Sequence, residues 1–207
     1  MIYRDTRRAL IDAAAEVIGR RGVEGASTRE IYQLAGVTAP TLYHHFGDKQ
    51  GLLDAVVTDA FERYLATKRA LPHSGDPAAD ARRGWDTHVA FAQANPELYQ
   101  LMWPLGQAAL PAAAAESAGE LEEAFTELGN LGYLRPGMTP RHAARTVSSA
   151  LRGVTAAIIR EPDDPGNQAL SATVRDAVID ALLVPVASRS PATGSPAGTD
   201  FDQQRER

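Results

Sequence analysis

Cysteine is absent from this chain of 207 residues. Without a thiol the protein cannot form a disulfide, use a cysteine nucleophile or bind a metal through thiolates. Apolar runs long enough to cross a bilayer are also missing, and the first five residues, MIYRD, lack the apolar core of a signal peptide. We therefore expect a cytoplasmic protein that has no membrane contact and needs no cofactor.

Sequence motifs of common catalytic sites are missing as well. The chain has no glycine-rich phosphate loop, no Gly-x-Ser-x-Gly and no His-Glu-x-x-His. The neighbouring His44 and His45 could suggest a metal site, but adjacent positions on a helix point about 100° apart and cannot converge on one ion. We therefore expect neither an enzyme nor a metal site.

A strong positive charge, which would mark a general nucleic-acid binder, is also lacking, because the net charge is −5. Its distribution is uneven: residues 1–50 hold seven Lys or Arg and six Asp or Glu, a net +1, whereas residues 51–207 are at −6. DNA binding by the N-terminal part would therefore depend on a few well-positioned phosphate contacts, whose number a dimer would double. Three arginines, Arg4, Arg7 and Arg8, are expected to face outward, where they either contact DNA phosphates or are simply solvated; both alternatives stay open.

Two short helices joined by a glycine turn are expected within this N-terminal part. Ser27 is a favoured N-cap residue and Glu30 stands three residues later, as in a capping box, so a helix should begin near Thr28. Gly36 supplies the left-handed conformation that ends a helix. Thr38 is expected to cap the helix that follows. Two helices in this arrangement form a helix-turn-helix.

The second of these helices, about residues 39–46, has two distinct faces. Leu42 and Phe46 stand four residues apart and are expected to face inward. The outward positions are small at the N-terminal end and polar after it, which suits a helix that enters a DNA major groove. Lys49 follows beside a helix N-terminus, where a cation and free amides together suit a phosphate. The outward residues are Ala39, Pro40, Thr41, Tyr43 and His44.

These residues follow, in order, a pattern known from one family. The pattern is a Thr opening the second helix, Ala-Gly-Val and then Ser or Thr at the turn, Tyr-x-His-Phe, and a Lys followed by a Leu. Its positions here are Thr28, Ala35-Gly36-Val37-Thr38, Tyr43, His45-Phe46, Lys49 and Leu52 or Leu53. The segment thus resembles the DNA-binding domain of TetR-type transcriptional repressors, which adds Thr28 and Thr38 to the expected DNA-binding residues. Tyr32 and Pro40 depart from the pattern, which usually has a small residue and a Gly or Ala there.

Capping and breaking residues divide the rest of the chain into further helices. Asp76-Pro77, Asn95-Pro96 and Thr139-Pro140 each pair an N-cap with a proline in the first turn. Because no segment alternates with period two for long enough to be a strand, we predict an all-α fold of about nine helices. Besides the two short ones, these cover about residues 4–21, 48–71, 76–94, a short stretch after Pro96, 112–131, 139–160 and 167–184.

Composition also suggests how the chain is divided. The helix over residues 48–71 has an apolar stripe two residues wide, so it can contact neighbours at both of its ends. Ser, Pro, Gly and Thr dominate beyond Pro185 and predict a disordered tail. The predicted parts are residues 1–50, a helix-turn-helix DNA-binding domain; 51–75, a linking helix and boundary; 76–186, a helical effector-binding and dimerisation domain; and 187–207, the tail.

Aromatic residues make up 6% of the chain, and several stand in one block, FAQANPELYQLMW. The block resembles a Phe-x-x-x-x-Pro-x-x-Tyr-x-x-Met segment of one set of TetR-type C-terminal domains. A cavity with few polar groups would suit a largely apolar small molecule. Met and aromatic residues at helical spacing more often fill a core, and that reading stays open. The predicted lining is Trp85, His88, Tyr99, Met102, Trp103 and Phe125.

The last two predicted helices are rich in small and β-branched residues. Two such helices from each subunit could pair across a two-fold axis as a four-helix bundle, giving the symmetric dimer that a palindromic operator requires. A helical hairpin within one chain is compatible with the same pattern. The predicted interface residues are Val147, Leu151, Val154, Ile158, Val174, Val178 and Leu182.

These observations predict a homodimeric, ligand-responsive transcriptional regulator, most readily a repressor. Its expected partners are a palindromic double-stranded DNA operator and a small-molecule effector. Two alternatives remain open: a DNA-binding regulator whose second domain only dimerises or answers to a protein partner, and an all-α enzyme or lipid carrier that kept the helical hairpin as a scaffold.

Overall fold

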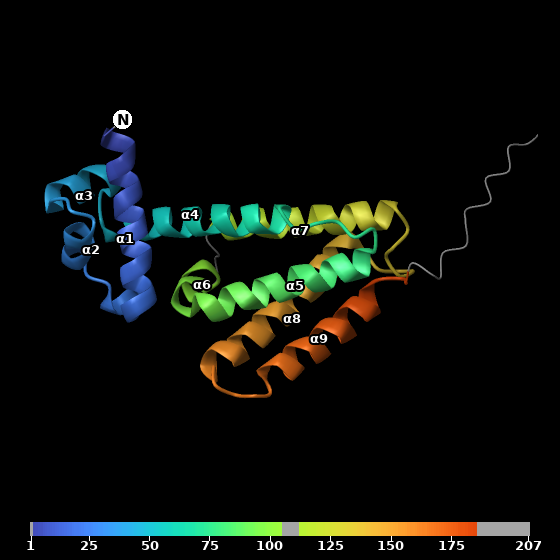
Figure 1. Cartoon of the computed structure of the whole chain (residues 1–207). Coiled ribbons are helices and arrows are strands. Elements are labelled where there is room, and N and C mark those ends of the chain that lie inside the picture. The colour runs from blue at the N-terminus through green and yellow to red at the C-terminus, as the bar shows by residue number, and fades with distance from the viewer. Residues whose placement is uncertain (1, 105–111, 186–207) are drawn as a thin grey trace, which may run out of the picture.

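The chain folds into α-helices throughout the residues that the computed structural model describes, 2–104 and 112–185 (Figure 1). This confirms the all-α class, and within these ranges an isolated bridge between Leu134 and Leu183 is the one sheet-like contact. None of the helices described is long and apolar enough to span a bilayer. The predicted tail lies outside the described residues. The helices are α1 (Ile2–Gly25), α2 (Thr28–Leu34), α3 (Ala39–Phe46), α4 (Lys49–Arg69), α5 (Pro77–Ala94), α6 (Pro96–Met102), α7 (Ala112–Asn130), α8 (Pro140–Arg160) and α9 (Asn167–Leu182).

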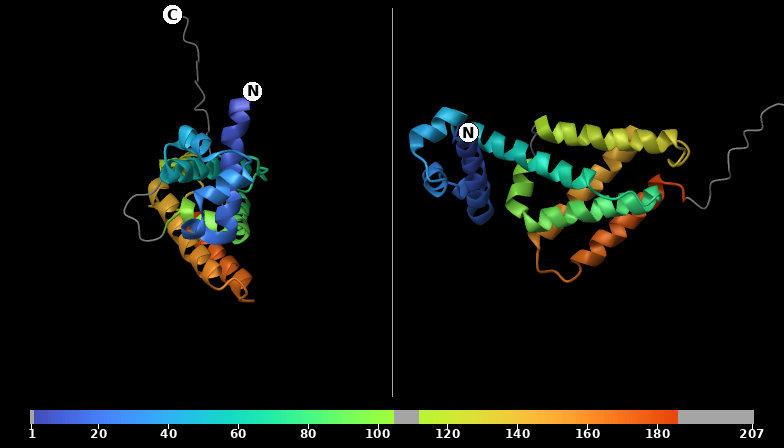
Figure 2. Two further views of the ribbon diagram at one scale, coloured as in Figure 1. Left: turned by 90° about the vertical axis from the view of Figure 1, so that its left-hand side faces the viewer. Right: turned by 45° about the horizontal axis from the view of Figure 1, so that its top comes forward.

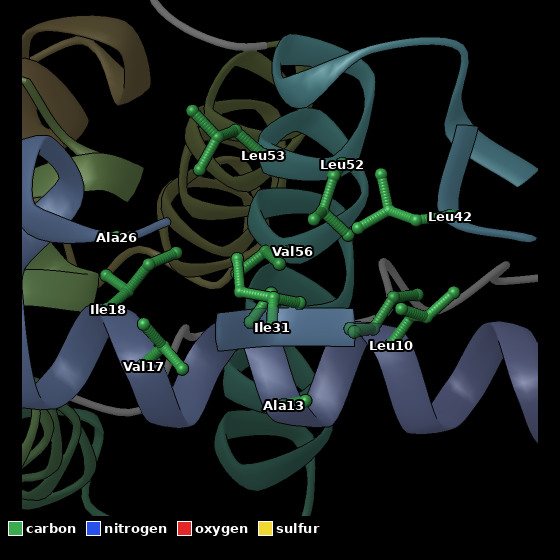
Figure 3. Close-up of a cluster of buried hydrophobic side chains, with 12 residues drawn as sticks. Leu10, Ala13, Val17, Ile18, Ala26, Ile31, Leu42, Leu52, Leu53 and Val56 are labelled. Atoms are coloured by element: carbon green, nitrogen blue, oxygen red, sulfur yellow. The ribbon is translucent and has the colours of Figure 1, made fainter. Parts of the chain in front are cut away.

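The first three helices surround one apolar core (Figure 3). Leu10 and Ile18 of α1 lie there with Ile31 of α2 and Leu42 of α3, and each is at most 1% exposed. Leu52 from the first turn of α4 is buried in the same cluster. Each such side chain contributes about 1.5–3 kcal/mol through burial, so the core fixes α3 relative to α1 and α4.

Helix α4 joins this N-terminal unit to the rest of the molecule (Figure 1). Its first turns contribute Leu53 and Val56 to the N-terminal core. Its later turns contribute Phe61 and Tyr64 to a second cluster, which also contains Met102 of α6. The wide apolar stripe seen in the sequence therefore belongs to a helix that is buried against different neighbours at its two ends.

The C-terminal unit is a helical bundle in which α5 and α8 lie between α7 and α9 (Figures 1 and 2). Its core contains Trp85 of α5, Phe125 of α7 and Ile158 of α8. Trp85 is 2% exposed, and its indole N–H donates to Ser171 Oγ at 3.0 Å, which satisfies the polar atom of a buried aromatic residue. The interior of the bundle is thus closed on the α9 side.

Helix α6 contacts both units. Leu98 and Leu101 pack against the N-terminal core, whereas Tyr99 and Met102 are buried in the C-terminal part. Helix α6 also lies against α1. The two units are therefore joined by α4, which contributes to both cores, and by α6, which packs against both units.

The ends of α1 and α9 compare differently with the prediction. The first helical segment of α1 ends at Gly22, as predicted, because Gly22 has the non-helical angles φ 69° and ψ 172°, and a second short helical segment follows it to Gly25. Helix α9 ends at Leu182 instead of residue 184, because Leu183 forms the bridge to Leu134 and the Val184 N–H donates to the Tyr133 carbonyl at 2.8 Å. Hydrogen bonds to a distant segment ended the helix, and local sequence does not report them.

Candidate DNA-binding surface and ligand cavity

The turn between α2 and α3 has the geometry that its residues predict. Ser27 Oγ accepts from the Glu30 N–H at 3.3 Å and begins α2. Gly36 has φ 68°, and the Val37 N–H donates to the Tyr32 carbonyl at 2.9 Å across the helix end. Tyr32, the departure from the family pattern, packs half-buried against the N-terminal core. The turn therefore fixes the orientation of α3 without strain at this bulky residue.

Helix α3 has the two faces expected of it. Leu42 is fully buried, and Phe46 packs against the same core. Tyr43 on the opposite face is 48% exposed. The small and polar residues predicted to face outward are exposed or half-exposed, and these are Ala39, Pro40, Thr41 and His44. The helix thus presents a surface of small and hydrogen-bonding side chains held from behind by two apolar anchors.

Thr38 corrects one detail of the prediction. It occupies the N-cap position of α3 but makes no side-chain cap bond, because its hydroxyl lies 2.9 Å from Thr41 Oγ1 and pairs with it. The first amides of α3 are therefore not capped by this side chain. At the start of α2, Thr28 is half-buried. Contacts of Thr28 and Thr38 with DNA stay predictions.

The junction between α3 and α4 depends on a glycine that the sequence did not single out. A Cβ placed on Gly51 would lie 2.1 Å from the carbonyl oxygen of Phe46, a backbone atom. Asp48 Oδ1 accepts from the Gly51 N–H at 2.8 Å and caps α4. Because the end of α3 lies directly on the first turn of α4, a side chain at residue 51 would separate the two helices.

Basic side chains around α3 are partly engaged within the protein. Lys49 Nζ donates to the Val23 carbonyl at 3.3 Å, which leaves further N–H groups of this ammonium for another acceptor. Arg8 hydrogen-bonds Asp12 and Asp59, and these contacts raise its pKa. The hypothesis that Arg8 reaches phosphate is therefore disfavoured, since two carboxylates already bind its charge.

A cavity of about 360 Å³ lies within the C-terminal unit, lined by residues of α4, α5, α7 and α8 together with Trp103 and Ile179. Four of the six predicted lining residues border it, namely Trp85, His88, Trp103 and Phe125. Tyr99 and Met102 do not. Met102 is fully buried in the cluster beside α4, and Tyr99 is buried with its hydroxyl bonded to His88 and Thr155, so their assignment to the lining is corrected.

His88 joins a chain of hydrogen bonds across four helices. Thr155 donates to the Leu151 carbonyl at 2.7 Å, so Tyr99 must donate to Thr155 at 2.8 Å. The Tyr99 oxygen then accepts from His88 Nε2 at 3.0 Å, and His88 Nδ1 accepts from Tyr64 at 2.7 Å. Burial lowers the pKa of His88 to about 3, which keeps the ring neutral. The chain thus links α4, α5, α6 and α8 beside the cavity.

Two cationic residues of the lining have no carboxylate partner among the described residues, and sequence reasoning missed both. Lys68 lies four residues after Tyr64 and seven after Phe61, so it continues the apolar stripe of α4. A cation at a position of that stripe was the sequence signal that could have identified it. Its ammonium donates to the Gly84 carbonyl, and burial lowers its pKa to about 8. Arg152 of α8 is the second, and no carboxylate partner for it occurs among the described residues.

The predicted dimer-interface residues lie mainly inside the chain. Val147, Leu151, Val154, Ile158 and Leu182 are at most 7% exposed and belong to the C-terminal core, and Val174 and Val178 pack against it. The five buried side chains can therefore contribute little to contact with a second subunit, whereas Val174 and Val178 are only half-buried, and the dimer interface stays a prediction. The outward faces of α8 and α9 carry other residues, small or apolar: Ser149, Gly153 and Ala156 on α8, and Leu170, Ala177 and Ala181 on α9.

Comparison with known proteins gives matches over both units. Residues 10–56 match the family described as "Bacterial regulatory proteins, tetR family", and residues 81–182 match "Tetracyclin repressor-like, C-terminal domain". The first match contains the turn and α3, and the second contains most of the cavity-lining residues of α5, α7 and α8.

Individual relatives are similar over different lengths. Tetracycline repressor protein class D of Escherichia coli is 37% identical over 70 residues, 34% of this chain but only 31% of that protein's length. The HTH-type transcriptional regulatory protein RaaS of Mycobacterium tuberculosis is 28% identical over 83% of this chain and 79% of its own. The regulator FadR of Bacillus subtilis, crystallised with stearoyl-CoA, has a TM-score of 0.66 at 19% identity and covers 84% of this chain and 98% of its own.

Proposed function

The chain belongs to the TetR family of DNA-binding transcriptional regulators, and from that premise we propose that it is a homodimeric repressor which a small molecule releases from a palindromic operator. The family consists of regulators and not of enzymes.

The exposed face of α3 is the observation that supports the proposal. Its exposed face begins with the compact Pro40 and continues with Tyr43 and His44, so it can approach base edges closely at one end and donate hydrogen bonds to phosphates behind. Burial of Leu42 holds that face outward. Lys49 retains donors for a phosphate beside the N-terminus of α4.

Two copies are expected to associate through the outward faces of α8 and α9. Ala177 and Ala181 are exposed on α9 together with Leu170, which is 41% exposed, and small residues at Ser149 and Gly153 allow close approach of α8. A symmetric pairing would place two copies of α3 in successive major grooves, about 34 Å apart.

A ligand in the cavity can act on α3 through two helices. Tyr64 of α4 and Tyr99 of α6 are held by His88, so displacement of this ring moves both helices together. Helix α4 carries α3 on its first turn, and α6 packs on α1 through Leu98. A ligand that favours the non-binding arrangement by about 1–3 kcal/mol weakens operator binding about 5- to 150-fold. That FadR binds an acyl ligand in a similar fold supports a ligand role for this domain.

The test is the affinity of a Tyr43→Ala variant for an operator duplex obtained by selection from random sequences. We expect fluorescence anisotropy to give at least tenfold weaker binding, about 1.4 kcal/mol, with unchanged thermal stability because Tyr43 is 48% exposed. Leu131→Ala, which removes a 56% exposed apolar side chain beyond α7, is the matched control and should bind as the parent does. Equal affinity of the Tyr43→Ala variant and the parent would count against α3 as the DNA-binding helix.

A further inference from the structure

Resting on the proposed ligand-responsive function, we propose that the effector is an amphipathic organic acid, whose apolar body fills the cavity and whose anionic group is bound by Lys68 with Arg152 nearby. The sequence predicted a largely apolar effector and did not predict an acid. The charges of the cavity lining carry this inference.

Lys68 is placed as an anion-binding residue. Its ammonium donates to the Gly84 carbonyl and lies 5.6 Å from the centre of the Tyr64 ring, a cation–π contact. An ammonium has three donors, and one is used by Gly84, so two remain. No carboxylate of the described residues pairs with it, and burial alone accounts for its lowered pKa. Lys68 is half-buried, and a cation held partly out of water without a counter-ion is unfavourable until an anion binds.

The remaining charges of the lining favour the same ligand. Lys68, Arg69 and Arg152 are its cations and Glu120 is its one acid among the described residues. Glu120 already pairs with Arg69. The lining therefore keeps two positive charges that are not matched within the described part of the chain.

Each of these two charges acts on one member of a hydrogen-bonded pair, His88 and Tyr99. Lys68 is close enough to His88 to help lower the pKa of the ring, and Arg152 is close enough to act on the pKa of Tyr99. His88 and Tyr99 are hydrogen-bonded to each other at 3.0 Å. An acid group near this pair would thus experience both cations.

The rest of the lining suits an apolar body. Trp85, Trp103, Phe125, Leu121 and Leu151 border the same space. Its volume of about 360 Å³ lies within the range of small-molecule sites, about 300–1,000 Å³. An apolar lining with a cationic group at one part of it favours a ligand that has an apolar body and an anionic group.

The experiment is calorimetric titration of the full chain, without DNA, with two sets of probes. One set is decanoate, methyl decanoate and decylamine; the other is 2-naphthylacetate, its methyl ester and 2-naphthylethylamine. We expect at least one acid to bind tenfold or more tightly than its own ester and amine. Both tryptophans of the chain, Trp85 and Trp103, line the cavity, so binding of the decyl compounds should also change intrinsic fluorescence.

Variants identify the cation responsible. Lys68→Met should abolish the preference for the acid while leaving ester binding in place, and Arg152→Met should reduce the preference. Arg83→Met removes an equal charge from α5 outside the cavity lining and should leave the preference unchanged. Circular dichroism checks that each variant is folded.

The inference is overturned if neither acid binds, if the esters or amines bind as tightly as the acids, or if the preference persists in Lys68→Met. Failure of the proposed function is a different result. A preferred acid that binds through Lys68 but leaves the operator complex intact would support the ligand class and contradict ligand-controlled release.

Discussion

Lys68 carries a charge on a half-buried side chain. Burial lowers its pKa from 10.5 to about 8, and each pKa unit corresponds to about 1.4 kcal/mol, so holding the proton in the folded state costs up to about 3 kcal/mol at pH 7. Gly84, its acceptor, lies inside α5, where a carbonyl also accepts from the residue four positions later. The ammonium is thus not needed to satisfy that carbonyl.

We predict that Lys68→Met increases the free energy of unfolding of the ligand-free protein by about 1–3 kcal/mol at pH 7, because Met has similar length without the charge. The sign with pH follows from the two pKa values. The unfolded chain keeps this proton up to about 10.5 and the folded chain up to about 8, so the parent gains stability between pH 8 and 10.5 and the difference should shrink there. Urea unfolding at several pH values measures it; a variant less stable than the parent at pH 7 would contradict the cost of the buried charge.

At the scale of elements, the junction of α3 with α4 determines how the DNA-binding face is presented. Gly51 allows the Phe46 carbonyl to rest on the first turn of α4. Because the clashing oxygen belongs to the backbone of Phe46, a change of side-chain rotamer cannot relieve the overlap. The position of α3 relative to α4, and hence to the second α3 of a dimer, is therefore sensitive to one methyl group.

We predict that Gly51→Ala lowers the free energy of unfolding by about 1–3 kcal/mol through this overlap and also weakens operator binding. Gly19→Ala is the matched control, since Gly19 is exposed in α1 and a Cβ there meets nothing within 4 Å. The control should be more stable than the parent by about 0.5–1 kcal/mol, because alanine favours helices over glycine. Thermal denaturation compares the two, and equal stability of Gly51→Ala and the parent would refute the overlap.

Local signals predicted the elements more completely than the contacts between them. The N-cap Ser27, the helix-ending Gly36 and the inward pair Leu42 and Phe46 depend on neighbours within a few residues, so the sequence contains them. The apolar stripe of α8 predicted burial correctly, but a stripe does not say which chain buries it. In the structure its own bundle does. The overlap at Gly51 likewise depends on a contact between two helices that no local pattern records.

The cavity shows the same limit. Trp85 and Phe125 were predicted for its lining from their size and spacing, and they border it. Tyr99 has the same local features but turns to Thr155 of α8, a residue 56 positions away. Lys68 was overlooked because a cation near the end of a helix is usually solvated. Which side chains border a space depends on the packing of four helices, and composition does not give it.

In the whole molecule, binding of two successive grooves requires that two copies hold their α3 helices at a fixed separation. The outward face of α9 is the proposed contact. Ala177→Glu places a charge there that faces its own symmetry mate, while Ala177 is exposed within the subunit and its replacement leaves the core intact.

We predict that sedimentation velocity finds at least tenfold weaker self-association of Ala177→Glu, with a corresponding loss of operator affinity. Ala90→Glu, at an exposed alanine of α5, is the matched control and should sediment as the parent does. If Ala177→Glu associates as strongly as the parent, the α9 face is not the dimer contact and the spacing of the α3 helices must be set elsewhere.

We expect a pair of α3 helices to bind successive major grooves of one duplex, and selection of bound sequences from a pool of random duplexes by the parent protein measures this. Binding of this kind should enrich inverted repeats whose half-sites lie about one helical turn, about 34 Å, apart, and the Tyr43→Ala variant should lose that enrichment. Enrichment of no sequence at moderate salt, or of sites without two-fold symmetry, would contradict it.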